Sequence, residues 1–191
     1  MQNRLLTQAE DIIRQGGVVA VAFEHLFGLA ADAANAKAVE RVFEIKKRDQ
    51  GSPVAVIIPS VYDMDRFVSS VPGEAWSLID AWWPGPLTIV LRARQGLNER
   101  IAGESGMIGM RVPGSCDAAR LCTDSGFALT ATSANVSGSD APVSTEDLMQ
   151  SGIAEKVDLV IPADALDGQP STVVEVTEKG VRLIRKGAII V

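Results

Sequence analysis

Residues 16–58 read GGVVAVAFEHLFGLAADAANAKAVERVFEIKKRDQGSPVAVII, and this stretch decides the fold class. Residues 18–21 form a short apolar run without charge, which is typical of a buried strand, and residues 54–58 form a second run of this kind. Between them, Asn35 can cap a helix whose apolar residues recur at helical spacing. This strand, helix and strand order predicts an α/β fold.

The rest of the chain extends this pattern. Apolar spacing predicts a first helix over residues 5–13, and residues 170–187 contain two strands joined by a Glu178-Lys179-Gly180 turn. The sequence contains no internal repeat, low-complexity tract or linker. We therefore expect one domain over residues 1–191, built on a twisted mixed β-sheet with flanking helices.

Composition excludes several classes of protein. The 191 residues are 47% hydrophobic and 22% charged, as in a soluble globular protein, and a net charge of −6 disfavours generic binding to a nucleic-acid backbone. Two cysteines and one histidine cannot supply a Cys/His zinc site, and we predict no metal ligands in the protein. The longest apolar run, residues 16–23, is far shorter than the roughly 20 residues that span a membrane. We expect a cytoplasmic protein that does not contact membranes.

Four segments carry polar or charged residues where chemistry could take place. They are residues 23–29 (FEHLFGL), 46–48 (KKR), 128–138 (ALTATSANVSG), and the pair 170–174 (PSTVV) with 182–187 (RLIRKG). Each has a structural interpretation as well: a turn, a helix end whose cations complement the dipole, a loop of small residues, and an edge hairpin. No segment matches a dinucleotide fingerprint or a P-loop.

Together these segments offer cations and hydroxyl groups but no evident nucleophile. That combination suits the binding of a polyanion and a reaction whose nucleophile belongs to the substrate. A non-catalytic anion-binding module would present the same surface, so both classes remain open at this point.

The order of these segments resembles the YrdC-like family of threonylcarbamoyl-AMP synthases, in its short single-domain form. The similarity runs from about residue 16 to residue 188. It rests on seven motifs: GL at 28–29, RVFEIKKR at 41–48, WPGPLT at 83–88, MRVP at 110–113, SANVSG at 133–138, STVV at 171–174 and RKGA at 185–188.

The resemblance implies a nucleotidyltransferase that converts L-threonine, bicarbonate and ATP into threonylcarbamoyl-AMP and pyrophosphate. It implies a divalent cation, with Mg²⁺ as the expectation. The product would then pass to a separate transferase complex that modifies an adenosine of tRNA. Any direct contact with RNA is expected to be weak and local to the basic residues at 46–48.

The resemblance also assigns roles to individual residues. Lys46 and Arg48 match the catalytic Lys-x-Arg motif that faces ATP and substrate. The positions expected at ATP are Arg48, Ser52, Ser133, Asn135 and Arg185. The positions expected at the amino acid are His25, Arg111, Ala131 and Ser171, with Arg111 suited to a carboxylate because a guanidinium can bind it with two hydrogen bonds.

The first loop departs from the family pattern. Phe23 and His25 stand where the family usually has Thr and then Thr or Ala, beside the expected amino-acid site. Asp49 replaces a usual Pro, and Ser52 takes a place often held by Asn. Two alternatives therefore stay open: a divergent paralogue that uses another carbamoyl or amino-acid donor, and a non-catalytic module that binds nucleotide or RNA.

Overall fold

A computed structural model describes residues 1–49 and 51–191. Its elements in chain order are α1 (Gln2–Arg14), β1 (Val19–Ala22), β2 (Phe27–Ala30), α2 (Ala36–Lys46), β3 (Ala55–Ile57), the 3₁₀ helix η1 (Val61–Arg66), α3 (Gly73–Trp82), β4 (Leu87–Arg92), α4 (Glu99–Ala102), β5 (Met107–Arg111), α5 (Asp117–Ser125), β6 (Leu129–Ser133), α6 (Thr145–Gln150), the 3₁₀ helix η2 (Ala154–Lys156), β7 (Leu159–Val160), β8 (Thr172–Thr177) and β9 (Gly180–Arg185).

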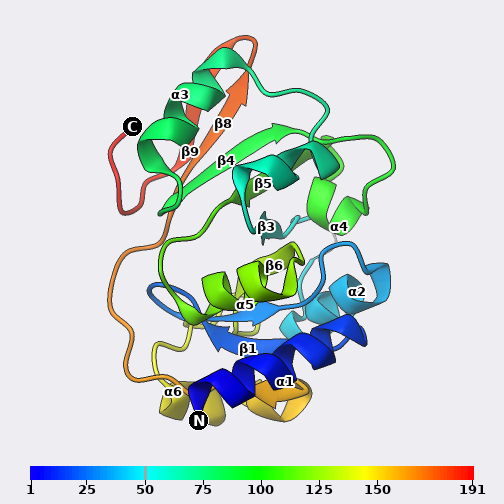
Figure 1. The fold of residues 1–191 in the computed structure, drawn as a ribbon, viewed down its shortest axis with the longest axis vertical. Coiled ribbons are helices and arrows are strands. Elements are labelled where there is room, and N and C mark those ends of the chain that lie inside the picture. Colours follow the sequence, from blue (N-terminus) through cyan, green and yellow to red (C-terminus); the bar gives the residue numbers. More distant parts are fainter. Residues whose placement is uncertain (50) are drawn as a thin grey trace.

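Nine strands of the described residues form one sheet in the order β7-β1-β2-β6-β3-β5-β4-β8-β9. The pairs β1–β7, β3–β5 and β4–β8 are parallel, and the other neighbouring pairs are antiparallel. The sheet is therefore mixed and twisted, with helices packed on it (Figure 1). This confirms the fold class predicted from the sequence.

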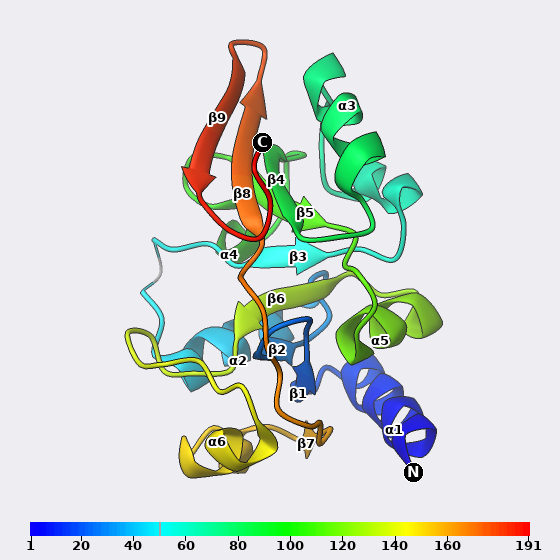
Figure 2. The same cartoon turned by 90° about the vertical axis from the view of Figure 1, so that its left-hand side faces the viewer.

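The helices divide unequally between the two faces of the sheet. In Figure 2, α1, α5 and α3 lie to one side of the strands, whereas α2 and α6 lie to the other side and only at the lower half. On the first side, Leu6 and Ile13 of α1 and Leu121 of α5 pack in one buried cluster with strand residues such as Val19. Residues of β3, β4, β5, β6 and β8 line a cavity on the other face.

Local sequence signals explain most element boundaries. The Asn35 side chain accepts hydrogen bonds from the backbone N–H groups of Lys37 and Ala38, so it caps α2 as predicted. Residues 27–29, which the sequence indicated as part of a turn, belong to β2 because this strand pairs with β1 on one side and with β6 on the other. Among the described residues, no helix is long and apolar enough to cross a membrane.

Candidate active site

A cavity of about 520 Å³ lies on the sheet face that α3 does not cover. Alternate residues of a strand point to opposite faces. On β5, Met107, Gly109 and Arg111 line the cavity, while Ile108 and Met110 are fully buried in the core beneath. The same alternation recurs along β4 and β8.

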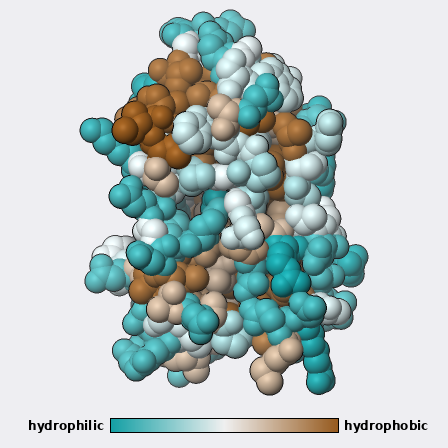
Figure 3. Space-filling model, turned by 60° about the vertical axis from the view of Figure 1, so that its left-hand side comes forward, coloured by the Kyte–Doolittle hydropathy of each residue, from teal (hydrophilic) through white to brown (hydrophobic). Residues whose placement is uncertain are grey.

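The middle of the cavity floor is made of small side chains. Ala55, Thr88, Gly109 and Ala131 lie on β3, β4, β5 and β6, four strands that are neighbours in the sheet. Because these side chains project little from the backbone, the floor is concave. Figure 3 shows hydrophilic side chains across the middle of one face of the molecule and apolar side chains gathered above them.

Three arginines from distant parts of the sequence meet in this cavity. Arg48 follows α2, Arg111 ends β5 and Arg185 ends β9, and all three line the same space. Burial lowers the pKa of Arg185, and the nearby charge of Arg111 lowers it further. The protein carries a net charge of −6, yet it concentrates positive charge where a polyanion could bind.

The guanidinium of Arg111 is paired with the carboxylate of Glu24. Its terminal nitrogens Nη1 and Nη2 donate to Glu24 Oε1 and Oε2, the second at 2.8 Å, and Nη1 also donates to the carbonyl of Gly85 at 3.4 Å. Burial alone would raise the pKa of Glu24, but the hydrogen bond and charge of Arg111 outweigh burial and hold the pKa below its ordinary value. The Glu24 carboxylate is therefore ionised at neutral pH.

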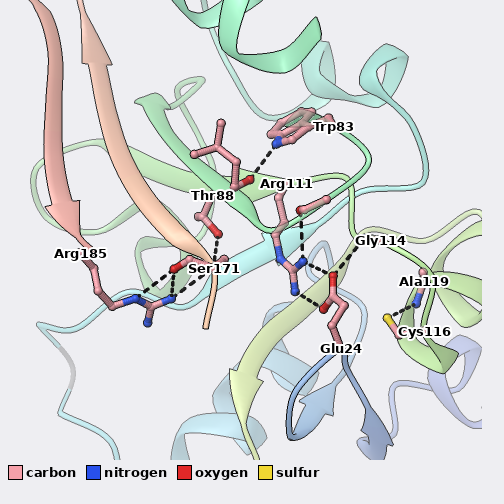
Figure 4. Close-up of polar contacts among 11 residues, drawn as sticks. Glu24, Trp83, Thr88, Arg111, Gly114, Cys116, Ala119, Ser171 and Arg185 are labelled. Atoms are coloured by element: carbon pink, nitrogen blue, oxygen red, sulfur yellow. Dashed lines mark hydrogen bonds and ion pairs between the residues drawn. The ribbon is translucent and has the colours of Figure 1, made fainter. Parts of the chain in front are cut away.

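Arg185 is oriented by Ser171. Arg185 Nη2 donates to the Ser171 carbonyl at 2.8 Å and to Ser171 Oγ at 3.2 Å, and Ser171 Oγ lies 2.9 Å from the buried hydroxyl of Thr88 (Figure 4). Sequence reasoning named Ser171 and Arg185 but missed Thr88 and Glu24. Both lie inside stretches that the sequence had singled out, FEHLFGL and WPGPLT, but no local signal marks their partners.

Lys46 does not line the cavity. It is 1% exposed, and its ammonium donates to the carbonyls of Ser133 and Asn135 and to Asn135 Oδ1. Burial lowers the pKa of Lys46 to about 8, with a smaller contribution from Arg48. Asn135 also donates from Nδ2 to Ser139 O, and Ser133 Oγ donates to Asn135 Oδ1. Lys46 therefore fixes the loop at residues 133–139, and its predicted contact with phosphate would require it to give up one of these bonds.

Only some of the remaining residues expected at ATP line the cavity. Arg48 lines the cavity, and its guanidinium donates to the carbonyls of Ser52 and Pro53 at 2.7 and 3.1 Å. Ser133 lines the cavity, whereas Ser52 and Asn135 do not. The structure thus brings Arg48, Ser133 and Arg185 into one space and leaves Ser52 to anchor Arg48 through its backbone.

The residues expected at the amino acid lie together. His25, Arg111, Ala131 and Ser171 all line the cavity. Burial lowers the pKa of His25, and the charges of Arg111 and Arg185 add to this effect while Glu24 opposes it. The imidazole is therefore neutral at pH 7.

Phe23, which the resemblance places beside the amino-acid site, lies at the edge of the cavity with its ring directed into the core. It borders the cavity but is only 4% exposed, and its ring packs in the cluster that includes Leu6 and Val21. A Cβ atom at Gly28 would lie 2.3 Å from Phe23 Cε2, so the ring occupies the space that this glycine leaves. Phe23 is primarily a core residue, and its replacement by Thr would open a cavity in the core.

The described part of the chain contains no cluster of metal-ligating side chains. Within residues 1–49 and 51–191, no group of three or more His, Cys, Asp or Glu side chains could hold a metal ion. Glu24 is bound to Arg111, and Glu175 at the cavity accepts a hydrogen bond from Arg182. Mg²⁺ in nucleotide-using enzymes commonly takes several ligands from water and substrate phosphates.

Comparison with known proteins finds several that are similar to this chain. The Sua5/YciO/YrdC family model, described as telomere recombination, matches residues 11–187. Threonylcarbamoyl-AMP synthase of Pyrococcus abyssi is 32% identical over 181 residues, covering 95% of this chain and 53% of that protein. The putative threonylcarbamoyl-AMP synthase of Methanocaldococcus jannaschii is 33% identical over 189 residues, covering 98% and 88%.

A solved structure shows the same likeness in three dimensions. The crystal structure of P. abyssi Sua5 complexed with L-threonine superposes with a TM-score of 0.90 at 31% identity, covering 98% of this chain and 55% of that one. The chain thus spans about half the length of its P. abyssi relative and most of the M. jannaschii protein.

Proposed function

The chain belongs to the Sua5/YciO/YrdC family, and from this premise we propose that it synthesises L-threonylcarbamoyl-AMP from L-threonine, bicarbonate and ATP, with release of pyrophosphate. The product would serve threonylcarbamoyl modification of tRNA. The P. abyssi Sua5 structure contains L-threonine, and the relatives are named for this product.

The observation that carries the proposal is the convergence of Arg48, Arg111 and Arg185 in one cavity. Adenylate transfer to a carboxylated amine needs no covalent enzyme intermediate. It needs orientation of two substrates and compensation of the charge that develops on the phosphates. Guanidinium groups in a partly desolvated cavity supply both.

The proposed reaction has two bond-forming steps. The amine nitrogen of threonine attacks the carbon of bicarbonate, and water leaves, which yields an N-carboxylate. An oxygen of that N-carboxylate then attacks the α-phosphorus of ATP, and the bond to the pyrophosphate leaving group breaks. Arg111 would hold the α-carboxylate of threonine, while Arg48 and Arg185 would face the phosphates. A divalent cation, held mainly by the nucleotide, would neutralise phosphate charge.

The chemistry of the proposed product indicates which reaction must come next. Threonylcarbamoyl-AMP is an activated acyl compound, so a transferase acting on tRNA must consume it. We propose that this is a separate transferase complex and that this chain contacts RNA at most weakly, because the basic cluster at residues 46–48 is small and Lys46 within it is buried. The cytoplasmic location stays a prediction.

The test is a product assay with the purified chain, ATP, bicarbonate, Mg²⁺ and a panel of L-amino acids. We expect pyrophosphate release and threonylcarbamoyl-AMP, identified by mass spectrometry, only when threonine and bicarbonate are both present. Arg111→Ala should abolish the product, while Arg182→Ala, an exposed arginine on the same sheet, should retain it.

Two other results would point to the alternatives. Product formation with a different amino acid would identify a divergent paralogue, a possibility that the imidazole of His25 at the cavity supports. ATP binding without turnover of any amino acid would indicate a non-catalytic module.

A further inference from the structure

The guanidinium of Arg111 is bound so tightly by the protein that only one of its edges can reach a ligand. The residue is 6% exposed, and the part of it that remains accessible borders the cavity. Glu24 lies across its end, with one carboxylate oxygen on Nη1 and the other on Nη2. This is a bidentate pair, the strongest common arrangement of an arginine and a carboxylate.

Three of the five N–H groups of the Arg111 guanidinium have acceptors among the described residues. A guanidinium has five N–H groups in a fixed plane. Glu24 takes one hydrogen from each terminal nitrogen, and the Gly85 carbonyl takes the second hydrogen of Nη1. Within the part of the chain that the structure describes, the Nε hydrogen and the second hydrogen of Nη2 have no protein acceptor. These two hydrogens are parallel and form the side edge of the guanidinium.

The side edge lies away from Glu24. In Figure 4 the Glu24 carboxylate lies on one side of the Arg111 guanidinium, and Ser171 and Arg185 lie on the other side. Ser171 and Arg185 both line the cavity. A carboxylate on the side edge would therefore lie between Arg111 and the groups expected to contact the rest of the substrates.

We propose that Glu24 is a positioning residue: it occupies the end of the Arg111 guanidinium and so directs the substrate carboxylate to the Nε and Nη2 edge. This inference rests on the proposed function, since it takes Arg111 as the residue that binds the amino-acid carboxylate. Without Glu24, the guanidinium could rotate and present either edge, and the bound amino acid would lose its fixed orientation toward ATP.

Glu24 is itself well fixed for this role. The backbone N–H of Gly114 donates to Glu24 Oε1 at 2.9 Å, so the carboxylate is held by the loop after β5 as well as by Arg111. Its pKa lies below the ordinary value because the hydrogen bond and charge of Arg111 outweigh the effect of burial, which keeps it charged at neutral pH. Glu24 also offsets the charge of Arg111, so Arg48 and Arg185 supply the excess positive charge for phosphates.

From these contacts we expect that loss of the Glu24 carboxylate weakens the binding of threonine but not the binding of ATP. Glu24→Gln keeps the size of the side chain but places an amide NH₂ against one of the Arg111 nitrogens. We expect the Kd for L-threonine, measured by isothermal titration calorimetry, to rise about tenfold or more, the effect of losing one charged hydrogen bond. The Kd for ATP should stay within about twofold. A role confined to stability would lower Tm without this split.

Glu40→Gln is the matched control. Glu40 binds Arg100 with both carboxylate oxygens, at 2.9 and 3.0 Å, and neither residue lines the cavity. The control should leave the Kd for both ligands unchanged. If Glu24→Gln does not fold, Glu24→Asp provides the second test: it keeps the charge but is one methylene shorter, and it should weaken threonine binding to an intermediate extent.

Three results would overturn the inference. Threonine binding that is unchanged in Glu24→Gln but lost in Arg111→Ala would show that Arg111 needs no positioning by Glu24, with the proposed function intact. Tighter threonine binding in Glu24→Gln would show that Glu24 competes with the substrate for the same edge. If the wild-type protein binds no threonine, or Arg111→Ala binds it normally, the premise taken from the proposed function fails instead.

Discussion

Gly187 lies where two segments of the chain touch backbone to backbone, next to Arg185. A Cβ atom added at Gly187 would lie 2.2 Å from the Pro170 carbonyl oxygen and 2.5 Å from the Ser171 carbonyl carbon. Backbone atoms cannot rotate away as a flexible side chain can, so Gly187→Ala must push the two segments apart. The overpacking costs about 1–3 kcal/mol. The Ala188 N–H to Pro170 O bond, 2.9 Å long, would also be strained or lost, at about 1 kcal/mol.

Together the two effects should reduce the free energy of unfolding by roughly 2–4 kcal/mol and lower Tm by about 5–15 °C in a chain of this size. Because Ser171 is one of the residues pushed away and its carbonyl holds Arg185, ATP binding should weaken about tenfold as well. Thermal unfolding followed by circular dichroism and calorimetric titration with ATP measure the two effects.

Gly73→Ala is the control for this prediction. Gly73 begins α3, and a Cβ atom there would have no neighbour within 4 Å. Alanine is the better helix former, so stability should hold or rise by up to about 1 kcal/mol. If Gly187→Ala melts like Gly73→Ala and binds ATP like the wild type, the close approach at residues 170–172 has no energetic importance and the reasoning fails.

Three further predictions concern basic side chains in the cavity or next to it. With a pKa lowered to about 8, Lys46 is mainly protonated at pH 7 and loses one hydrogen-bond donor as the pH rises through 8. ATP affinity measured from pH 6.5 to 9.5 should therefore fall above pH 8 in the wild type. In Lys46→Met the affinity should be low and independent of pH. Arg185→Ala should weaken ATP binding about tenfold. Arg182 has a side chain that is 67% exposed, and Arg182→Ala should change the Kd for ATP by no more than about twofold. Equal losses of affinity in the two variants would contradict a specific role for Arg185. His25→Thr removes a ring from the cavity and should lower the KM for threonine severalfold in steady-state assays, and an unchanged KM would show that the imidazole does not restrict the site.

Local signals made much of the fold predictable. The Asn35 cap, the apolar spacing of α1 and the uncharged runs at β1 and β3 are all properties of a few neighbouring residues, and the structure contains each of these elements. β2 was missed because its four residues, FGLA, are few and do not alternate between apolar and polar side chains. It is a strand only because β1 and β6 supply its hydrogen-bond partners, and β6 is about a hundred residues away in the sequence.

The sequence by itself determined which groups were available for chemistry. Arg48, Arg111, Ser171 and Arg185 could be named from motifs, and the absence of a nucleophile beside them pointed to a reaction between substrates. The structure gathers these four residues in one cavity. Arg48, Ser171 and Arg185 lie in segments that residue chemistry had singled out, whereas Arg111 was identified only through the resemblance to the family.

Only the tertiary structure decided what each group does there. Lys46, named from the same motif as Arg48, turns inward and fixes a loop 87 residues further along the chain, and Glu24 meets Arg111 across the same separation. Such partnerships depend on the order of strands in the sheet and on which face each side chain occupies. Sheet order is set by hydrogen bonds and packing between distant segments, so no short stretch of sequence contains it.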